Sequence, residues 1–422
     1  MRIIVKEPRP LTGTYQPSGN SNEAIALLAA GMLSQEPSTL HDVPDTTAVH
    51  EMVDFIRQLG GTCDWTGQTV QVRNSGIGTR FPRGASAQLP VAAILLLAPL
   101  LANRGYAALE WPAPLGRLHT HLAALRDLGV RVDVSGTRIE LHAAPWQEAD
   151  IVLTETSVTA TALVCMLAAT QAATTRLYNA ASEPHLRSLQ RVLVQMGARI
   201  DGIGSNLLTI HGVAGGLAGA EHQILPNHIE IASMAGIAAL LPGHITIEPV
   251  VPEDLRIIRK VFARLGITLL SDGPRLHVPE HQQLLTSRRE EDVDVEIDTA
   301  PWPGFPSDLV ALTTVLATQA QGTTLIHEKL FSNRLLFVDK LKSMGAQIIL
   351  ADPHRAVVIG PTPLQAEYLD TPDVRTGLAL LAAALCAKGD VVIDRAELIA
   401  RNFADVVPKL QALGADIMVE PT

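Results

Sequence analysis

Six times along the chain, an amphipathic segment ends in Leu-Gly or Met-Gly and is followed by a short run rich in β-branched residues. The segments end at intervals of 69, 68, 69, 79 and 69 residues, at Gly60, Gly129, Gly197, Gly266, Gly345 and Gly414. Glycine suits this position because a helix that turns back into a strand commonly ends on a left-handed residue. The pattern therefore predicts six copies of one unit of about 70 residues.

A second helix is predicted near the start of each unit. These segments are rich in Ala and Leu and are apolar on nearly every side, which is typical of helices buried inside a domain. They span Asn22–Ser34, Pro90–Asn103, Ala160–Thr170, Glu230–Leu241, Asp308–Gln319 and Arg375–Ala387. Strands are expected between the two helices, for example at Thr39–Val43, Thr175–Asn179, Ile245–Pro249 and Thr324–His327. Each unit thus combines two helices with two or three strands, which predicts an α/β protein.

Length and charge narrow the class of protein. At 422 residues the chain exceeds what one hydrophobic core usually organises, so we expect the six units to divide between two domains. With 33 Lys and Arg against 43 Asp and Glu, the formal net charge of −10 does not suit binding to a nucleic-acid backbone. The three cysteines lack C-x-x-C spacing, so neither a disulfide framework nor a zinc site is indicated, and we expect them to be buried as small hydrophobes.

No targeting segment is predicted. Residues 1–10 alternate charge with apolarity and lack the apolar centre of a secretory signal. The longest apolar run, Leu89–Ala102, is interrupted by prolines and is shorter than the roughly 20 residues of a membrane span. We therefore expect a cytoplasmic protein with small-molecule partners and without a membrane or nucleic-acid partner. The polar stretch Glu280–Asp294, inside the one long interval, is expected to be a solvated surface excursion.

Three segments carry residues suited to chemistry. Residues 16–22, Gln-Pro-Ser-Gly-Asn-Ser-Asn, lead into the first buried helix, whose N–H groups can either bind an anion or be capped. The proline-rich residues 299–308 end in Asp308 at the start of another buried helix, where the carboxylate can act as an N-cap or as a general base. Arg334, Arg375 and Arg401 would form a clamp for a phosphate or a carboxylate if they converge, although single arginines are usually solvated.

These residues belong to motifs whose order along the chain resembles that of the enolpyruvyl transferases. The motifs are Ser18-Gly19 with Asn22, Glu183-Pro184, Leu225-Pro226, Phe305-Pro306-Ser307-Asp308, Phe331-Ser332-Asn333-Arg334, Asp373-Val374-Arg375 and Arg401. The resemblance covers essentially the whole chain and is closer to the branch that acts on UDP-N-acetylglucosamine than to the shikimate branch. It implies a two-domain inside-out α/β barrel with three units in each domain, residues 18–227 forming one domain and residues 1–17 with 228–422 the other. The site is expected in the cleft between the domains.

The resemblance also implies an activity. In this family the enolpyruvyl group of phosphoenolpyruvate moves to a hydroxyl by addition and elimination, and phosphate is released. The acceptor would be UDP-N-acetylglucosamine or a related nucleotide sugar, which places the reaction in peptidoglycan and cell-wall synthesis. The catalytic residues that the resemblance implies are Asp308, which would take the proton from the attacking hydroxyl, and Arg401. Arg334 and Arg375 would hold phosphoenolpyruvate together with Arg401. The other substrate-binding residues that the resemblance implies are Asn22, Ser21, Arg117, His119 and Asp373. No cofactor and no metal are expected.

Three departures from the family pattern concern the groups that face phosphoenolpyruvate. The family has a lysine where this chain has Ser21, and no lysine occurs between residues 6 and 260. The family's arginine at the start of the second buried helix is replaced by residues 89–91, Leu-Pro-Val, with Arg80 and Arg83 upstream as candidate substitutes. The loop that carries a reactive cysteine in most of the family is shortened to residues 111–117 and has none; an alignment shifted by one residue would let Arg117 replace its arginine.

Two functions from different classes therefore stay open on the sequence. Because a buried charge-assisted hydrogen bond contributes on the order of 1.5 to 3 kcal/mol, losing two or three cations could cost several powers of ten in rate or affinity. The chain is either an enolpyruvyl transferase or a divergent homologue that binds a nucleotide-sugar-like anion without turnover or with another reaction. A role in nucleic-acid end processing rests on distant fold analogy alone and conflicts with the acidic charge.

Overall fold

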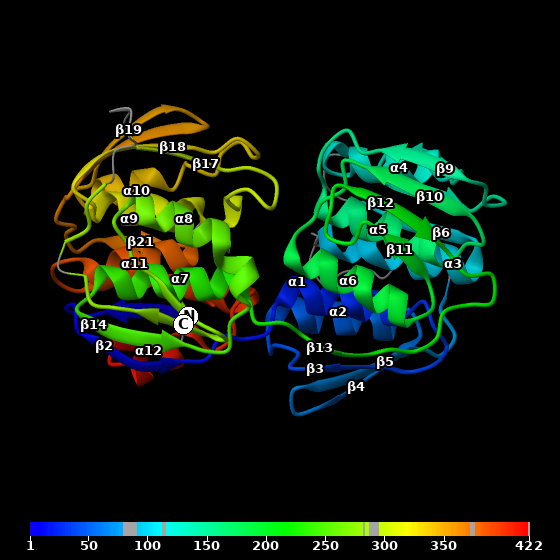
Figure 1. Ribbon diagram of the computed structural model, residues 1–422, viewed down its shortest axis with the longest axis horizontal. Helices are drawn as coiled ribbons and strands as arrows, with labels where there is room; N and C mark the ends of the chain where they lie inside the picture. Colours follow the sequence, from blue (N-terminus) through cyan, green and yellow to red (C-terminus); the bar gives the residue numbers. More distant parts are fainter. Residues whose placement is uncertain (79–90, 112–114, 282, 287–294, 372–375, 421–422) are drawn as a thin grey trace. The chain divides into compact units, whose positions relative to one another are not determined.

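The computed structural model describes residues 1–78, 91–111, 115–281, 283–286, 295–371 and 376–420. The chain forms two compact units (Figure 1). Unit 1 consists of Met1–Ser18 together with Pro226–Thr422, and unit 2 consists of Gly19–Leu225. Three of the six repeats fall in each unit.

Unit 2 contains, in its described part, three inner and three outer helices. The inner helices are α1 (Ser21–Gly31), α3 (Leu97–Arg104), which continues the 3-10 helix η1 (Val91–Leu96), and α5 (Val158–Ala169). The outer helices are α2 (Thr47–Gln58), α4 (His119–Asp127), which follows the 3-10 helix η2 (Leu115–Leu118), and α6 (Pro184–Gln195).

The described strands of unit 2 form three sheets, with the orders β13-β3-β5-β4, β6-β8-β7 and β11-β12-β10-β9. Their bounds are β3 (Ser38–His41), β4 (Gly61–Thr66), β5 (Thr69–Asn74), β6 (Tyr106–Glu110), β7 (Arg131–Ser135), β8 (Arg138–His142), β9 (Ala149–Val152), β10 (Thr174–Tyr178), β11 (Arg199–Asp201), β12 (Leu207–His211) and β13 (Glu221–Gln223). The expected strands at Thr39–Val43 and Thr175–Asn179 are β3 and β10, each displaced by one or two residues.

Unit 1 repeats this arrangement. Its inner helices are α7 (His228–Leu240), α9 (Val310–Gln319), which continues the 3-10 helix η4 (Ser307–Leu309), and α11 (Gly377–Cys386). Its outer helices are α8 (Arg256–Arg264), which continues the 3-10 helix η3 (Pro252–Leu255), α10 (Val338–Ser343) and α12 (Val406–Ala412); the 3-10 helix η5 (Ala396–Arg401) precedes α12.

The described strands of unit 1 also form three sheets, with the orders β15-β16-β14-β2, β17-β18-β20-β19 and β21-β22-β1-β23. Their bounds are β1 (Arg2–Val5), β2 (Leu11–Tyr15), β14 (Gly243–Ile247), β15 (Leu270–Asp272), β16 (Arg275–Val278), β17 (Val295–Asp298), β18 (Gly322–His327), β19 (Gln347–Asp352), β20 (Arg355–Gly360), β21 (Tyr368–Asp370), β22 (Val391–Asp394) and β23 (Ile417–Glu420). Because β1 and β2 complete two of these sheets, the first residues of the chain belong with its second half.

The sheets share one pairing rule. The strand that follows an inner helix pairs in parallel with one neighbour and antiparallel with the other, as β14 does with β2 and β16, and β18 with β17 and β20. Strand β6 departs from this rule, because among the described residues it pairs only with β8. The six sheets stay separate, so the described strands do not close into one continuous barrel, although helices fill the interior and sheets form the outer layer as expected.

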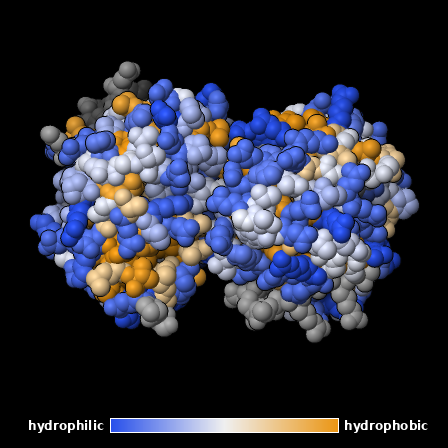
Figure 2. Space-filling view, turned by 90° about the horizontal axis from the view of Figure 1, so that it is seen from below, coloured by the Kyte–Doolittle hydropathy of each residue, from blue (hydrophilic) through white to orange (hydrophobic). Residues whose placement is uncertain are grey.

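The inner helices are buried because their sequences are apolar on almost every side. Nine of the ten residues of α9 and nine of the ten residues of α11 are buried, and both helices pack against α7. Helix α8, in contrast, buries only Ile258, Val261 and Phe262, spaced for one face. The hydrophobic core of each unit therefore surrounds its inner helices, and polar residues cover most of the face in Figure 2, with apolar residues in smaller groups.

The six repeat glycines confirm the predicted helix ends. Each follows the last turn of an outer helix, and its φ lies between +79° and +116°. A side chain is strained in this region, so glycine lets the chain leave the helix and enter the next strand. Among the described residues, no helix combines the length and the apolar character needed to cross a membrane.

The chain leaves unit 1 after Ser18, which a buried carboxylate holds in place. The Asn227 N–H donates to the Ser18 carbonyl at 2.9 Å, and the Ser18 N–H donates to Glu230 Oε1 at 3.1 Å. Lys409 Nζ lies 3.1 Å from the same Glu230 oxygen and balances its charge inside the unit. The start of α7 and the end of the first chain segment are thus fixed together.

The return crossing, at Leu225, follows the same pattern in unit 2. The Asn20 N–H donates to the Leu225 carbonyl at 2.9 Å, and the Leu225 N–H donates to Glu23 Oε1 at 3.2 Å. His222 Nε2 lies 2.9 Å from that oxygen, and burial raises the pKa of Glu23. This pattern fixes the start of α1, the helix that carries Ser21.

Candidate functional site

The carboxylate of Asp308 lies at the start of inner helix α9. Pro306 caps η4 with an extended backbone, φ −70° and ψ 135°, and η4 continues directly into α9. Proline suits this cap because its ring fixes φ near about −65°. Ser307 and Leu309 are buried on either side, whereas the side chain of Asp308 is 42% exposed. The turn therefore presents one carboxylate to solvent from a rigid helix start.

Arg334 is an ion-pair partner of Asp308. Its Nη1 donates to Asp308 Oδ1 at 3.1 Å. The Arg334 side chain is only 14% exposed, and its guanidinium lies over the ring of Phe331, 4.3 Å from the ring centre. Burial and the ring contact restrict the orientation of the guanidinium. The structure thus brings two of the predicted residues together, a permanent cation and a carboxylate that stays accessible.

The other predicted residues of unit 1 are described less completely. Arg401 ends η5, after strand β22 and before outer helix α12, and is half-buried. Asp373 and Arg375 lie outside the described residues, directly before inner helix α11. The arginine clamp is therefore described at Arg334 and Arg401, and its convergence stays a prediction.

In unit 2, a side chain caps the first turn of α1. Asn20 Oδ1 accepts hydrogen bonds from the N–H groups of Asn22 at 2.9 Å and Glu23 at 3.2 Å. Of the two alternatives offered by the sequence, the structure shows capping, so these two N–H groups are not open to an anion. Ser21 is buried with its Oγ 3.2 Å from Thr46 Oγ1, whereas Asn22 is exposed. Unit 2 thus offers a neutral hydroxyl where the family pattern has a lysine.

The start of outer helix α4 carries a predicted site histidine, His119, and a second histidine, His121, that was not predicted. Arg117 and His119 are both exposed, at the end of η2 and the start of α4. His121 is buried, and its Nε2 lies 2.7 Å from Oγ1 of Thr159 in the first turn of α5. Its Nδ1 has no hydrogen-bond partner in the described part of the chain. Burial lowers the pKa of His121 to about 4, so the ring is neutral near pH 7.

Helical spacing could have identified His121. It lies one turn after the buried Leu118 and one turn before the buried Leu125, on the same face as Leu122. This face is the one that packs on the unit interior, whereas His119 points away from it. The signal in the sequence is therefore a polar residue on a buried helical face.

Cysteine and metal chemistry find little support in the described residues. Cys63 and Cys165 are buried as expected, and burial raises the pKa of each thiol to about 12, which makes them poor nucleophiles. Cys386 is only half-buried, contrary to expectation, and none of the three forms a disulfide.

One group of three side chains is close enough to share a metal ion. Glu296, Asp298 and His327 place their ligand atoms within 4.8 Å of one another. Lys329 Nζ, however, lies 2.9 Å from Asp298 Oδ2 and already supplies a positive charge there. The donor set therefore gives no support for a resident metal.

Several sequence predictions concern residues outside the described ranges. These are Arg80 and Arg83, the Leu89-Pro90 pair, and most of the polar stretch 280–294. They stay predictions.

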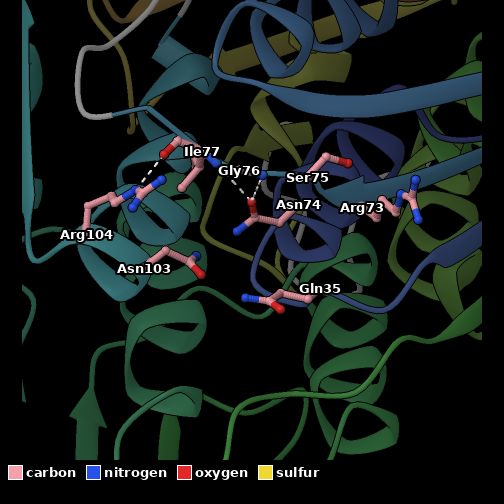
Figure 3. Close-up of a pocket in the computed structure, with 8 residues that line it drawn as sticks. All are labelled: Gln35, Arg73, Asn74, Ser75, Gly76, Ile77, Asn103 and Arg104. Carbon is pink, nitrogen blue, oxygen red and sulfur yellow. Dashed lines mark hydrogen bonds between the residues drawn. The ribbon is translucent and has the colours of Figure 1, made fainter.

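A cavity of about 470 Å³ lies in unit 2 and is lined by residues that are not among the predicted site residues (Figure 3). It is formed where the end of β5 meets the end of α3. Asn74 Oδ1 accepts hydrogen bonds from the N–H groups of Gly76 and Ile77, and Arg104 Nε donates to the Ile77 carbonyl at 2.6 Å. These contacts shape the local turn, and the described residues show no buried charge aimed into the cavity.

Comparison with known proteins finds one matching family model and many similar chains. The model of EPSP synthase (3-phosphoshikimate 1-carboxyvinyltransferase) matches residues 5–410. A protein of Treponema denticola named UDP-N-acetylglucosamine 1-carboxyvinyltransferase is 42% identical and is covered, like this chain, over 98% of its length. The protein of the same name from Bradyrhizobium diazoefficiens is 40% identical over 100% of this chain and 98% of its own.

Solved structures of the same fold are more distant in sequence. The enolpyruvyl transferase NikO from Streptomyces tendae has a TM-score of 0.85 at 22% identity, covering 99% of this chain and 98% of its own. EPSP synthase from Acinetobacter baumannii has a TM-score of 0.76 at 15% identity, with both chains covered completely. At these identities the likeness concerns the fold.

Proposed function

This chain belongs to the EPSP synthase family, and from that premise we propose that it transfers the enolpyruvyl group of phosphoenolpyruvate to a hydroxyl of UDP-N-acetylglucosamine and releases phosphate. Relatives that carry the name of this activity are 40–42% identical over essentially the whole chain. Such coverage favours the transferase over a homologue without turnover.

The Asp308–Arg334 pair is the observation that carries the proposal. In the addition step, the acceptor hydroxyl adds through its oxygen to C2 of phosphoenolpyruvate and loses its proton, while C3 gains one. In the elimination step, C3 loses a proton and the C2–O bond to phosphate breaks. A general base must lie within reach of the hydroxyl proton, and the accessible carboxylate of Asp308 at a rigid helix start suits that task.

The guanidinium of Arg334 supplies the matching positive charge. It is permanently charged, partly buried and 3.1 Å from Asp308, so it can bind a phosphate or carboxylate oxygen beside the base. Arg401 and Arg375 complete the proposed phosphoenolpyruvate end, and Asp373 is a further proposed substrate-binding residue. A fixed cation stabilises the negative charge that develops as phosphate departs.

We assign acceptor binding to residues of unit 2. Asn22, Arg117 and His119 are exposed at the starts of α1 and α4 and can donate to the sugar and the diphosphate. Ser21 contributes a hydroxyl in place of the family's lysine. In this proposal, Arg117, at the end of the shortened loop, provides a positive charge that Ser21 does not.

Phosphate release tests the proposal. The protein is incubated with phosphoenolpyruvate alone, with UDP-N-acetylglucosamine, and with other nucleotide sugars, and free phosphate is followed. Asp308→Asn should lower kcat by about 1,000-fold or more, because the amide cannot accept the proton. Asp339→Asn, an exposed carboxylate in the first turn of α10, is the matched control and should keep the rate. Thermal stabilisation by the nucleotide sugar without phosphate release would instead support a non-catalytic homologue.

A further inference from the structure

A completely buried carboxylate, Glu328, lies directly after strand β18 and was not among the predicted site residues. It is 0% exposed. Its Oε1 accepts hydrogen bonds from Thr299 Oγ1 at 3.1 Å and from the N–H groups of Leu330 at 2.8 Å and Phe331 at 3.1 Å. Its Oε2 accepts a hydrogen bond from Ser307 Oγ. A buried carboxylate held by four donors is fixed in place and is not open to substrate.

The backbone of Glu328 is fixed as well. Its carbonyl accepts a hydrogen bond from His354 Nδ1 at 2.7 Å, and its N–H donates to the His354 carbonyl at 2.8 Å. His354 lies in the turn between β19 and β20, the sheet that contains β18. Through its backbone, Glu328 is therefore fixed to the sheet, and through its carboxylate it is bonded to the four donors described above.

The donors to Glu328 belong to the two segments that carry the catalytic pair. Ser307 directly precedes Asp308 and is itself buried. The N–H groups of Leu330 and Phe331 belong to the turn that leads to Arg334, whose guanidinium rests on the Phe331 ring. The Glu328 carboxylate is thus bonded both to the turn that carries Asp308 and to the turn that leads to Arg334.

Resting on the proposed function, we propose that Glu328 is a positioning residue for the transfer reaction, holding Asp308 and Arg334 in register through Ser307 and the Leu330–Phe331 backbone. Displacement of a reacting group by about 1 Å can lower a rate 100-fold, which gives such a residue a direct effect on turnover. Glu328 does not exchange protons with substrate and acts only through its neighbours.

Two matched hydroxyl deletions separate positioning from general stability. Ser307→Ala removes the bond between Glu328 and the Asp308 turn. Thr299→Val removes another hydroxyl that donates to the same carboxylate, together with a bond from the Lys329 N–H at 2.9 Å. If Glu328 served only to hold the fold together, Thr299→Val should be at least as harmful as Ser307→Ala.

We expect Ser307→Ala to lower kcat about 10- to 100-fold with both KM values within twofold, because the substrates still bind but Asp308 is misplaced. Ser307→Thr, which restores the hydroxyl, should recover most of kcat. Thr299→Val should lower the melting temperature and keep kcat within twofold. Equal kcat losses in Ser307→Ala and Thr299→Val, or no loss in Ser307→Ala, would overturn the proposal.

A crystal structure of each variant gives a readout that does not depend on activity. The Asp308 Oδ1 to Arg334 Nη1 distance should exceed 3.5 Å in Ser307→Ala and stay near 3.1 Å in Thr299→Val. An unchanged pair in Ser307→Ala would contradict positioning even if the unmodified protein released no phosphate. Absence of phosphate release by the unmodified protein, with a displaced pair in Ser307→Ala, would instead sink only the proposed function.

Discussion

The two units are built from the same repeat, yet the polar groups at the starts of their helices differ in charge. In unit 1, Asp308 and Arg334 bring a carboxylate and a guanidinium to within 3.1 Å. In unit 2, Ser21 pairs with the Thr46 hydroxyl, and the buried His121 ring is neutral near pH 7. Opposed charges suit proton transfer and anion binding, whereas the acceptor-binding groups that we assign to unit 2 are the exposed Asn22, Arg117 and His119. One scaffold thus carries a charged pair in unit 1 and buried neutral groups in unit 2, and we assign the chemistry to unit 1.

Removing the guanidinium of Arg334 should have the largest effect on catalysis among the changes compared between the two units. Arg334→Met is expected to lower kcat/KM for phosphoenolpyruvate by about 100- to 1,000-fold, because one fixed charge-stabilising donor is lost. Steady-state kinetics with varied phosphoenolpyruvate measures the change. Arg355→Met, which breaks an exposed ion pair with Asp352 in the same unit, should change the same ratio less than twofold. Equal losses of kcat/KM in the two variants would contradict a specific role of Arg334 in binding phosphoenolpyruvate.

Protonation of His121, the buried neutral histidine of α4, should lower the free energy of unfolding. The folded pKa of His121, about 4, lies below the unfolded value, so the unfolded chain binds more protons in the acidic range and stability falls as pH decreases from 7 toward 4. Between pH 7 and pH 5 we expect a loss of about 2 kcal/mol from this ring. Urea unfolding at both pH values measures it.

Two variants at the start of α4 decide whether His121 is responsible for that loss. His121→Gln should flatten the pH dependence, whereas His119→Gln, which changes the exposed histidine two residues earlier, should leave it as in the unmodified protein. An unaltered pH dependence in His121→Gln would show that His121 does not titrate in this range.

The smallest effect on kinetics is expected at Ser21, the position where the family has a lysine. Ser21→Ala deletes a neutral hydroxyl, so KM for phosphoenolpyruvate should change by less than about threefold. Steady-state kinetics beside Arg334→Met gives the comparison directly. A loss as large as that of Arg334→Met would mean that unit 2 does take part in binding the anion.

The repeat and its inner helices could be predicted from sequence because their signals are local. Gly60 and its five counterparts lie where a helix must end, and an unbroken apolar pattern predicts a buried helix whatever its neighbours are. The separation of the strands into six sheets could not be predicted from local signals, because it depends on which strands, distant in sequence, pair with one another. The bounds of η4 were also missed, because a 3-10 turn before α9 has no distinct periodicity.

Residues of the candidate site could be predicted from the sequence only where they belong to a recognisable motif. Asp308 and Arg334 belong to recognisable motifs, and the structure joins them. Glu328 was missed because a glutamate at the end of a strand usually faces solvent, and its burial depends on donors that arrive from residues 299 and 307. The sequence does not distinguish the Asn20 cap from an anion site, because capping and anion binding use the same residue types.

The most direct test separates binding of the acceptor from the transfer itself in one variant. Binding of UDP-N-acetylglucosamine to Asp308→Asn is measured by calorimetry, and enolpyruvyl transfer is followed in a single turnover with phosphoenolpyruvate. If chemistry resides in unit 1 and acceptor recognition in unit 2, the dissociation constant should stay within about threefold while transfer slows by about 1,000-fold or more. Loss of acceptor binding with transfer intact at saturating acceptor would contradict this assignment.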